Sequence, residues 1–284
     1  MNWKNIAKRA GAFGMSLCVA ATTLISGSSN VLAEGGPVIE YTGPSEYAGR
    51  MVGNFFFNGE RAFCLEHSKL SPETGTPVET SPYENDMIKT VLYYGWDGKG
   101  NIFTDEAEGV VRTSSALSVL YSGDNENGQM LAQPLLDYAA ANLITDMNIY
   151  FSKESVTASI AGDQQKTEEI TVNGDARNTV SFSLPEQVVL HNKTTGEETG
   201  GEVTVKGGDV FFLTAPLNGA ADFSTGILKG SMGYCQPLFL KTSSDEVQDL
   251  IAMWWKDPEH TTSLSVTWQK AGNIKVSKTD SESG

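Results

Sequence analysis

Residues Gly53–Pro72 read GNFFFNGERAFCLEHSKLSP, and they combine a hairpin pattern with a cysteine. Aromatic residues bounded by Asn and Gly in Gly53–Arg61 predict a strand followed by a hairpin turn. Cys64 follows, and the chain then enters a loop rich in proline. A cysteine in this setting can form a disulfide, act as a catalytic thiol, or be consumed in another covalent bond. The rest of the sequence bears on that choice.

The first 33 residues have the pattern of a secretory signal peptide. Lys4, Lys8 and Arg9 precede an apolar, Ala-rich run over about 10–25, and Val31–Ala33 has the small-residue pattern that signal peptidase reads. The apolar run is too short and too often interrupted by polar residues for a membrane span. We therefore expect cleavage after residue 33 and a secreted product with no membrane insertion in its mature part.

The mature chain is strongly acidic. Residues 1–33 hold three of the 20 Lys and Arg and none of the 35 Asp and Glu, so their removal leaves 251 residues with a net charge of −18. This charge argues against nucleic acid and anionic membranes as partners. No cofactor or metal is predicted, because the Cys and His residues lack the spacing of a four-ligand zinc site. The histidines, among them His67, are expected to be polar surface residues.

A helical section is predicted over about residues 85–145. Asn85 can cap a short helix that ends at Gly95. Residues 104–108 open a second helix with acids in its first turn, where the helix dipole favours them. A third helix is predicted from about Gly128 to Leu143.

From Met147 onward the pattern changes to short alternating segments rich in β-branched residues. Turns at Asn173–Gly174 and Gly207–Gly208 are expected to separate these predicted strands. Strands, then clustered helices, then many strands predict an α+β fold, in which a β-sandwich or barrel domain carries an inserted helical subdomain.

Several residues offer alternative chemistry. Cys64 and Cys235 are the mature cysteines, and a single disulfide between them is possible, in which case the chain is a structural surface or stalk protein. A cysteine protease needs a histidine base, and His67 is three residues from Cys64, but no protease signature surrounds that cysteine. Gln236 and Gln248 each lie among apolar residues on a likely strand, where a buried carboxamide must find hydrogen-bond partners.

The chain resembles the thioester domains of Gram-positive surface adhesins. The resemblance spans roughly Gly53 to Lys270 and rests on RAFCLEHSKLSP, IKTVLYYGWDG, RTSSALSVLYSG, VTVKGGDVFFLTAP and VQDLI. The ending GNIKVSKTDSESG resembles the first strand of a collagen-adhesin B-type repeat. The implied organisation is a signal peptide at 1–33, a thioester adhesin domain at 34–270 and the start of a truncated B-type repeat at 271–284.

The resemblance implies an internal thioester between Cys64 and a glutamine, formed with loss of ammonia. Gln248 fits the family's apolar-Gln-x-apolar pattern best, and Gln236 is the alternative, because Pro237 is awkward in a central strand. The implied protein is an adhesin, not an enzyme. A lysine amine on a host surface or matrix protein would open the bond and become covalently attached.

One helix departs from the family pattern. The family usually has a Thr-Gln pair there, and the matching residues are Thr113 and Ser114. Either hydroxyl is expected to replace the missing amide; otherwise the domain has lost the thioester and binds its ligand non-covalently. By the same resemblance, Lys278 is the isopeptide-forming lysine of the repeat, with partners beyond residue 284.

Overall fold

A computed structural model describes residues 36–256 and 261–270. The expected signal peptide at 1–33, the repeat strand at 271–284 and Lys278 lie outside the described residues. The described residues from Pro37 onward belong to one compact unit. Within the described ranges, none of the helices is both long enough and apolar enough to span a bilayer.

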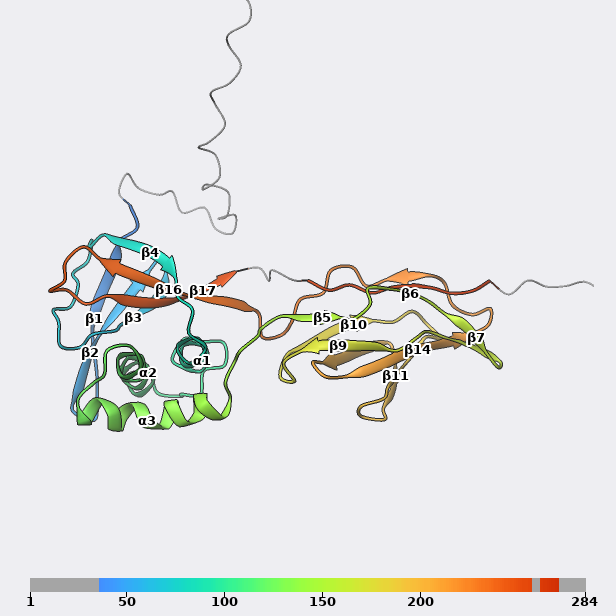
Figure 1. The fold of residues 1–284 in the computed structure, drawn as a ribbon, viewed down its shortest axis with the longest axis horizontal. Helices are drawn as coiled ribbons and strands as arrows, with labels where there is room; N and C mark the ends of the chain where they lie inside the picture. Colours follow the sequence, from blue (N-terminus) through green and yellow to red (C-terminus); the bar gives the residue numbers. More distant parts are fainter. Residues whose placement is uncertain (1–35, 257–260, 271–284) are drawn as a thin grey trace, which may run out of the picture. The chain divides into compact units, whose positions relative to one another are not determined.

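Six antiparallel strands form the sheet that carries Cys64. In spatial order they are β1 (Ile39–Tyr47), β2 (Arg50–Phe57), β3 (Glu60–Cys64), β17 (Leu250–Lys256), β16 (Tyr234–Thr242) and β4 (Val78–Pro82). Val38 and Pro77, the residues directly before β1 and β4, form a bridge that brings the two outer strands together, so the sheet closes into a barrel. In Figure 1 the blue and cyan strands lie beside the orange β16 and β17, which come from much later in the sequence.

The hairpin between β2 and β3 has the turn that the sequence predicts. Asn58 and Gly59 have φ angles of 52° and 84°. A two-residue type I′ turn requires such positive values at both positions. Phe55 then lies opposite Ala62. The turn fixes the register of β3 and therefore the position of Cys64 at its end.

Three helices follow β4, inside the stretch predicted to be helical. They are α1 (Asp86–Tyr94), α2 (Glu106–Tyr121) and α3 (Glu126–Ala141). Their N-caps are Asn85, Asp105 and Asn125. The side chain of each accepts a hydrogen bond from the backbone N–H of the residue three positions later. The predicted starts of α1 and α2 are confirmed. The third helix begins two residues before the expected Gly128, because Asn125 provides the cap.

Strand β3 faces two different cores. Phe63 and Leu65 pack with buried residues of the helices, whereas Ala62 and Cys64 pack with barrel residues such as Leu250. Successive side chains of a strand point to opposite faces of the sheet. The helices therefore cover the outer face of the barrel, and Cys64 lies on its inner face.

The strands between α3 and β16 build a β-sandwich with its own core. They are β5 (Ile149–Phe151), β6 (Ser155–Thr157), β7 (Ser159–Ala161), β8 (Gln164–Lys166), β9 (Ile170–Gly174), β10 (Thr179–Ser183), β11 (Val189–Asn192), β12 (Glu198–Gly200), β13 (Glu202–Lys206), β14 (Val210–Pro216) and β15 (Phe223–Ser224); β18 (Ser265–Thr267) joins them after β17. The rings of Phe151, Phe182 and Phe211 contact one another in this core, with centroids 5.6 to 6.5 Å apart.

The prediction of a turn at Asn173–Gly174 is wrong, although the turn at Gly207–Gly208 is confirmed. Gly174 ends β9 and lies opposite Ile149 of β5. A Cβ at Gly174 would meet the carbonyl oxygen of Asn148 at 2.8 Å. Glycine is therefore needed here for the close approach of two strands, and not for a hairpin turn.

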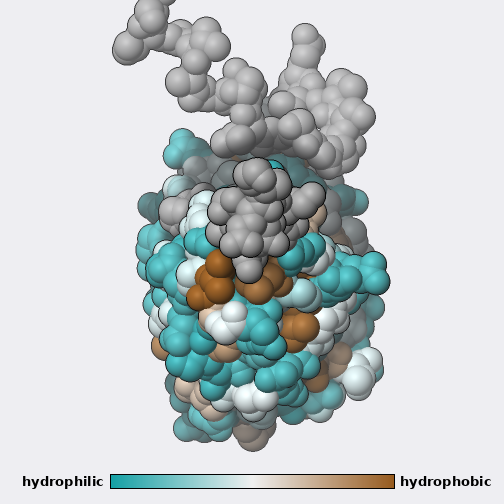
Figure 2. Space-filling model, turned by 90° about the vertical axis from the view of Figure 1, so that its right-hand side faces the viewer, coloured by the Kyte–Doolittle hydropathy of each residue, from teal (hydrophilic) through white to brown (hydrophobic). Residues whose placement is uncertain are grey.

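The predicted fold class is confirmed: an α+β fold with a β-barrel and a β-sandwich, and with helices inserted between the strands. Hydrophilic residues dominate the face shown in Figure 2, and only small hydrophobic patches interrupt them.

Candidate functional site

Cys64 and Gln248 lie on neighbouring segments of the barrel. Cys64 ends β3 directly opposite Leu250 of β17, and Gln248 precedes Leu250 by two residues. Gln248 therefore lies just before β17, in the segment whose backbone bonds to the loop after Cys64, and its side chain and that of Cys64 line the same pocket. Each of the two residues is 4% exposed.

The loop after Cys64 surrounds the carboxamide of Gln248. Gln248 Nε2 donates to the carbonyl oxygen of Lys69 at 3.2 Å and to Ser71 Oγ at 3.3 Å. The backbone N–H of Gln248 donates to the carbonyl oxygen of Leu70 at 2.9 Å. Gln248 Oε1 is buried without a hydrogen-bond partner, a state that costs roughly 1–3 kcal/mol. The carboxamide is thus fixed through its nitrogen.

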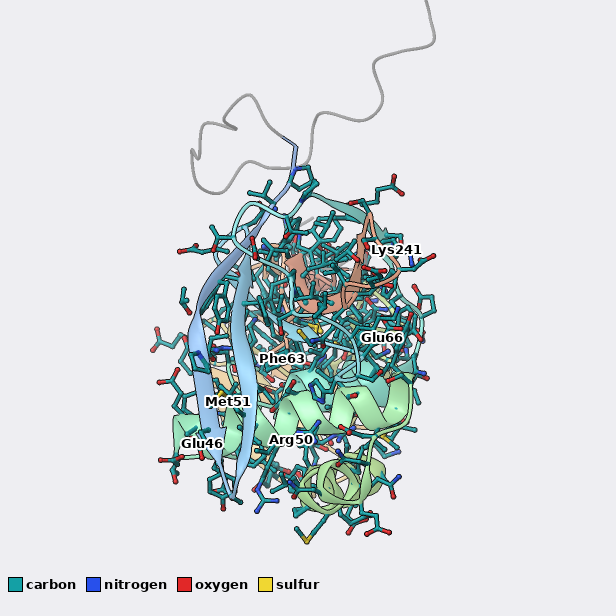
Figure 3. The ribbon with its side chains drawn as sticks, turned by 90° about the vertical axis from the view of Figure 1, so that its left-hand side faces the viewer. Glu46, Arg50, Met51, Phe63, Glu66 and Lys241 are labelled. Carbon is teal, nitrogen blue, oxygen red and sulfur yellow. The ribbon has the colours of Figure 1, made fainter. Side chains whose placement is uncertain are left out.

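A pocket of about 370 Å³ lies beside these two residues. Its lining residues are Gly49–Gly53, Cys64, His67, Lys69, Ser71, Asn125, Asn127 and Gln248. Figure 3 views this side of the barrel, with Arg50 and Met51 on the β1–β2 hairpin and Glu66 across from them. The pocket gives small groups a route from solvent to two buried side chains.

The alternative glutamine, Gln236, lies away from Cys64. The β16 residue in line with Cys64 is Leu240, and the four residues from there to Gln236 span about 13 Å of strand. Gln236 Nε2 donates to the carbonyl oxygen of Tyr83 at 3.3 Å and to Glu84 Oε1 at 3.1 Å. Gln236 lines a different pocket, of about 240 Å³.

The disulfide that the composition allows is absent, because Cys64 and Cys235 are both free. Cys235 Sγ lies 3.2 Å from Met147 Sδ, in the core beneath the helices. Cys64 packs in the barrel interior. The two side chains therefore point to opposite faces of the same sheet, where no S–S bond can join them.

Burial keeps both thiols protonated at neutral pH. It raises the pKa of Cys64 strongly, and it raises the pKa of Cys235 to about 12. A protease nucleophile needs the opposite, a lowered pKa that yields a thiolate. Cys64 therefore lacks the environment of a hydrolytic cysteine, and any reaction of its sulfur needs a nearby group that accepts the proton.

The two helix residues that the family resemblance implies differ in their contacts. Thr113 Oγ1 donates to the carbonyl oxygen of Gly109 at 2.7 Å and accepts the backbone N–H of Trp96 at 2.9 Å. Its hydroxyl is therefore used within the fold. Ser114 is 2% exposed, and its Oγ lies 2.9 Å from Nε2 of His67. Of the two, Ser114 is the one connected to the pocket lining.

His67 is only partly exposed, at 16% of its side chain, and its ring is bonded on both sides, so the prediction of a simple surface residue is wrong in part. Its Nδ1 lies 3.1 Å from Asp124 Oδ2 and also contacts the guanidinium of Arg50. Asp124 and Arg50 form an ion pair whose side chains are 5% and 9% exposed. The loop holding His67 folds against α2, where Ser122 Oγ donates to the carbonyl oxygen of Leu65 at 2.7 Å. That long-range contact buries the ring.

The charges around His67 fix its protonation state. Burial lowers the pKa of His67 from its ordinary value of 6.5, and Arg50 lowers it further, against the opposing effect of Asp124. The ring is therefore neutral at physiological pH. Burial alone would raise the pKa of Asp124, but hydrogen bonds from His67 and Asn125 and the charge of Arg50 outweigh it and lower that pKa.

Sequence reasoning did not single out Arg50, Asp124 or Asp249. Asp249 is 3% exposed; it accepts the backbone N–H of Thr242 at 2.9 Å and a hydrogen bond from Lys241 Nζ at 3.1 Å, which braces the segment that carries Gln248. The chain has 35 acidic residues, and spacing along the sequence selects none of them. The one available signal was the Cys-x-x-His spacing of Cys64 and His67.

Two families match consecutive parts of the chain. Residues 31–145 match the family described as "Thioester domain", and residues 150–232 match the family described as "TED associated beta sandwich domain". The chain is therefore similar to a thioester domain over its first matched stretch and to the β-sandwich associated with such domains over its second. The barrel strands β16 and β17, and Gln248 with them, lie beyond both matched stretches.

Several solved structures match the chain at low sequence identity. The Bacillus anthracis TIE protein is 19% identical, over 83% of this chain and 49% of that chain, with a TM-score of 0.47. The thioester domain of the Enterococcus faecium TIE86 protein is 16% identical, over 85% and 99%, with a TM-score of 0.41. The N-terminal domain of the Streptococcus pyogenes pilus tip adhesin Cpa is 8% identical, over 83% and 100%, with a TM-score of 0.33. The chain thus spans about half the length of the Bacillus anthracis chain. No curated protein matches it.

Proposed function

We propose that Cys64 and Gln248 form an internal thioester and that the mature protein uses it to attach covalently to an amine on a host surface or matrix protein. One observation carries the proposal. Cys64 and the carboxamide of Gln248, far apart in the sequence, line the same pocket, and the amide oxygen there has no partner. The match of residues 31–145 to thioester domains supports the same chemistry.

Formation of the bond is a single self-modification. Cys64 Sγ attacks Gln248 Cδ, the C–N bond breaks, and the proton of the thiol leaves with the nitrogen as ammonia. Holding the two groups in the fold replaces a bimolecular collision with a positioned one. No oxidant or reductant is required, because the oxidation state of every atom is unchanged.

Burial of both residues suits a bond that water would hydrolyse. An amine entering the pocket attacks the same carbonyl carbon, the C–S bond breaks, and Cys64 is released as a thiol while an amide joins the two proteins. Each molecule reacts once, so the protein is an adhesin and not an enzyme.

The expected location is the cell surface. The signal peptide expected at residues 1–33 supports export, and one structure of similar fold is described as a pilus tip adhesin. The net charge of the mature chain disfavours nucleic acid and anionic membranes as partners. The B-type repeat with Lys278 as its isopeptide lysine stays a prediction.

Methylamine labelling followed by peptide mapping tests the proposal. Treatment of the mature protein should place a methylamide on Gln248 and free Cys64 for alkylation, in equal amounts. Cys64→Ser and Gln248→Ala should abolish the label, whereas Gln236→Ala, the matched control, should leave it unchanged. A methylamide on Gln236 would mean that the thioester forms with Gln236 and not with Gln248. If the wild-type chain takes up no label, it has no thioester, and the alternative function is non-covalent binding of a ligand.

A further inference from the structure

We propose that His67, held between Asp124 and Ser114, is the proton-transfer group for both the formation and the aminolysis of the thioester. This inference rests on the proposed function. It assigns a role to the cluster of His67, Asp124 and Ser114. Neither the family matches nor the family pattern of the helix α2 predicts proton transfer there.

The position of His67 carries the inference. The residue lines the pocket together with Cys64 and Gln248. Its ring is held at both nitrogens: Nδ1 lies 3.1 Å from Asp124 Oδ2 and also contacts the guanidinium of Arg50, and Nε2 lies 2.9 Å from Ser114 Oγ. A carboxylate, an imidazole and a hydroxyl in sequence are the arrangement in which a histidine is oriented to move protons. Ser114 is the residue that stands where the family usually has a glutamine.

The two reactions need the same proton transfer. Thioester formation moves a proton from Cys64 Sγ to the departing nitrogen of Gln248. Aminolysis moves a proton from the attacking amine to the departing Sγ. Formation is the reverse of aminolysis by ammonia, so by microscopic reversibility one group serves both directions. His67 accepts the proton at Nε2, directly or through the hydroxyl of Ser114, and returns it to the leaving group, so that no net proton is consumed.

The surroundings supply a base in the required state. The groups facing the ring are Arg50 from β2, Asp124 from the segment before α3, and Ser114 from α2. Burial and Arg50 keep the imidazole neutral and able to accept a proton. Asp124, ionised beside it, stabilises the imidazolium formed in the transfer. Because the thiol of Cys64 is protonated, a separate base is required.

The β-sandwich offers a matched control histidine. His191 Nε2 lies 2.8 Å from Thr214 Oγ1, and its Nδ1 lies 3.0 Å from Glu198 Oε1. It therefore has the same kinds of neighbour as His67, but it does not line the pocket of Cys64. Replacement of His191 should not affect the reaction.

The test measures the rate of methylamine incorporation into thioester-loaded protein, expressed per unprotonated amine, from about pH 5 to about pH 8. The wild-type rate should fall at the acid end, as His67 becomes protonated. His67→Gln should react more slowly, by a factor on the order of 100 or smaller, and its rate should not fall at the acid end. Added imidazole should restore part of the rate. Asp124→Asn should give an intermediate loss, and His191→Gln should match the wild type.

Opening the thioester with ammonia restores the amide of Gln248, and refolding of these chains from urea without ammonia then measures the forward reaction. Loss of ammonia from His67→Gln should be slowed by a factor similar to that for aminolysis. Wild-type rates and an unchanged pH profile in His67→Gln would overturn the role of His67, as would slow variants that imidazole does not rescue. These results differ from failure of the proposed function, in which the wild-type chain itself loses no ammonia.

Discussion

At the scale of single residues, Gln248 is defined by an asymmetry. Its amide nitrogen has two acceptors and its oxygen has none. A purely structural buried glutamine would be expected to satisfy both ends. The orphaned oxygen belongs to the carbonyl that the proposed reaction attacks, which gives a chemical reason for an arrangement that stability alone does not favour.

The lowered pKa of His67 predicts a pH-dependent stability. In the unfolded chain the histidine takes up a proton near pH 6.5, whereas the folded chain does so only at lower pH. Between these values the unfolded state binds more protons, so the free energy of unfolding falls as the pH decreases through 6.5. Urea unfolding of the wild type at pH 7 and at about pH 5 should show this loss.

His67→Gln should remove that part of the pH dependence, and His191→Gln should retain it. Equal losses in the wild type and His67→Gln over this range would contradict the burial and charge environment assigned to the ring.

Residue identities were predictable from the sequence only where a local pattern marked them. Cys64 follows a strong hairpin signal, and Gln248 fits a local motif. The distinction between Gln248 and Gln236 depends on the register of β3, β17 and β16, which pairs segments far apart in the chain. The cluster around His67 depends on contacts with Arg50 and Asp124, 17 and 57 residues away in sequence, which no local spacing encodes.

At the scale of elements, capping and turn residues made the helices and the first hairpin predictable. The caps of α1 and α2 and the Asn58–Gly59 turn act within a few residues of their own position. The error at Asn173–Gly174 has the opposite origin. The pairing of β9 with β5 decides the conformation there, and an Asn-Gly dipeptide is as compatible with a close strand contact as with a turn.

The β2–β3 turn should be sensitive to the loss of glycine. Gly59 has a φ of +84° and no atom near its ideal Cβ position, so Gly59→Ala costs backbone strain without a clash. The expected loss is about 1–2 kcal/mol in the free energy of unfolding. Gly200→Ala is the control, since Gly200 is outside the positive-φ region and its Cβ would make an ordinary contact. Equal urea midpoints for the two variants would contradict the turn assigned to Gly59.

At the scale of the whole molecule, the barrel is built from both ends of the described chain. Strands β16 and β17 complete the sheet that β1–β4 begin, and all the β-sandwich strands except β18 lie between β4 and β16 in the sequence. The segment matched to thioester domains, residues 31–145, therefore lacks two central neighbours of β3 and β4. Such a fragment leaves exposed edges and an open core.

Residues 34–145 expressed alone should therefore not fold, whereas residues 34–270 should. Far-ultraviolet circular dichroism and the dispersion of amide proton resonances separate the two outcomes. A cooperative thermal transition in the short fragment would show that its strands and helices suffice without β16 and β17.

The intact mass of the untreated mature chain tests the central claim most directly. The account predicts a wild-type protein lighter by one ammonia than its sequence requires, with no free thiol at Cys64 after gentle denaturation. Cys64→Ser and Gln248→Ala should each have their full calculated mass. A wild-type chain of full mass, with Cys64 open to alkylation, would contradict the thioester.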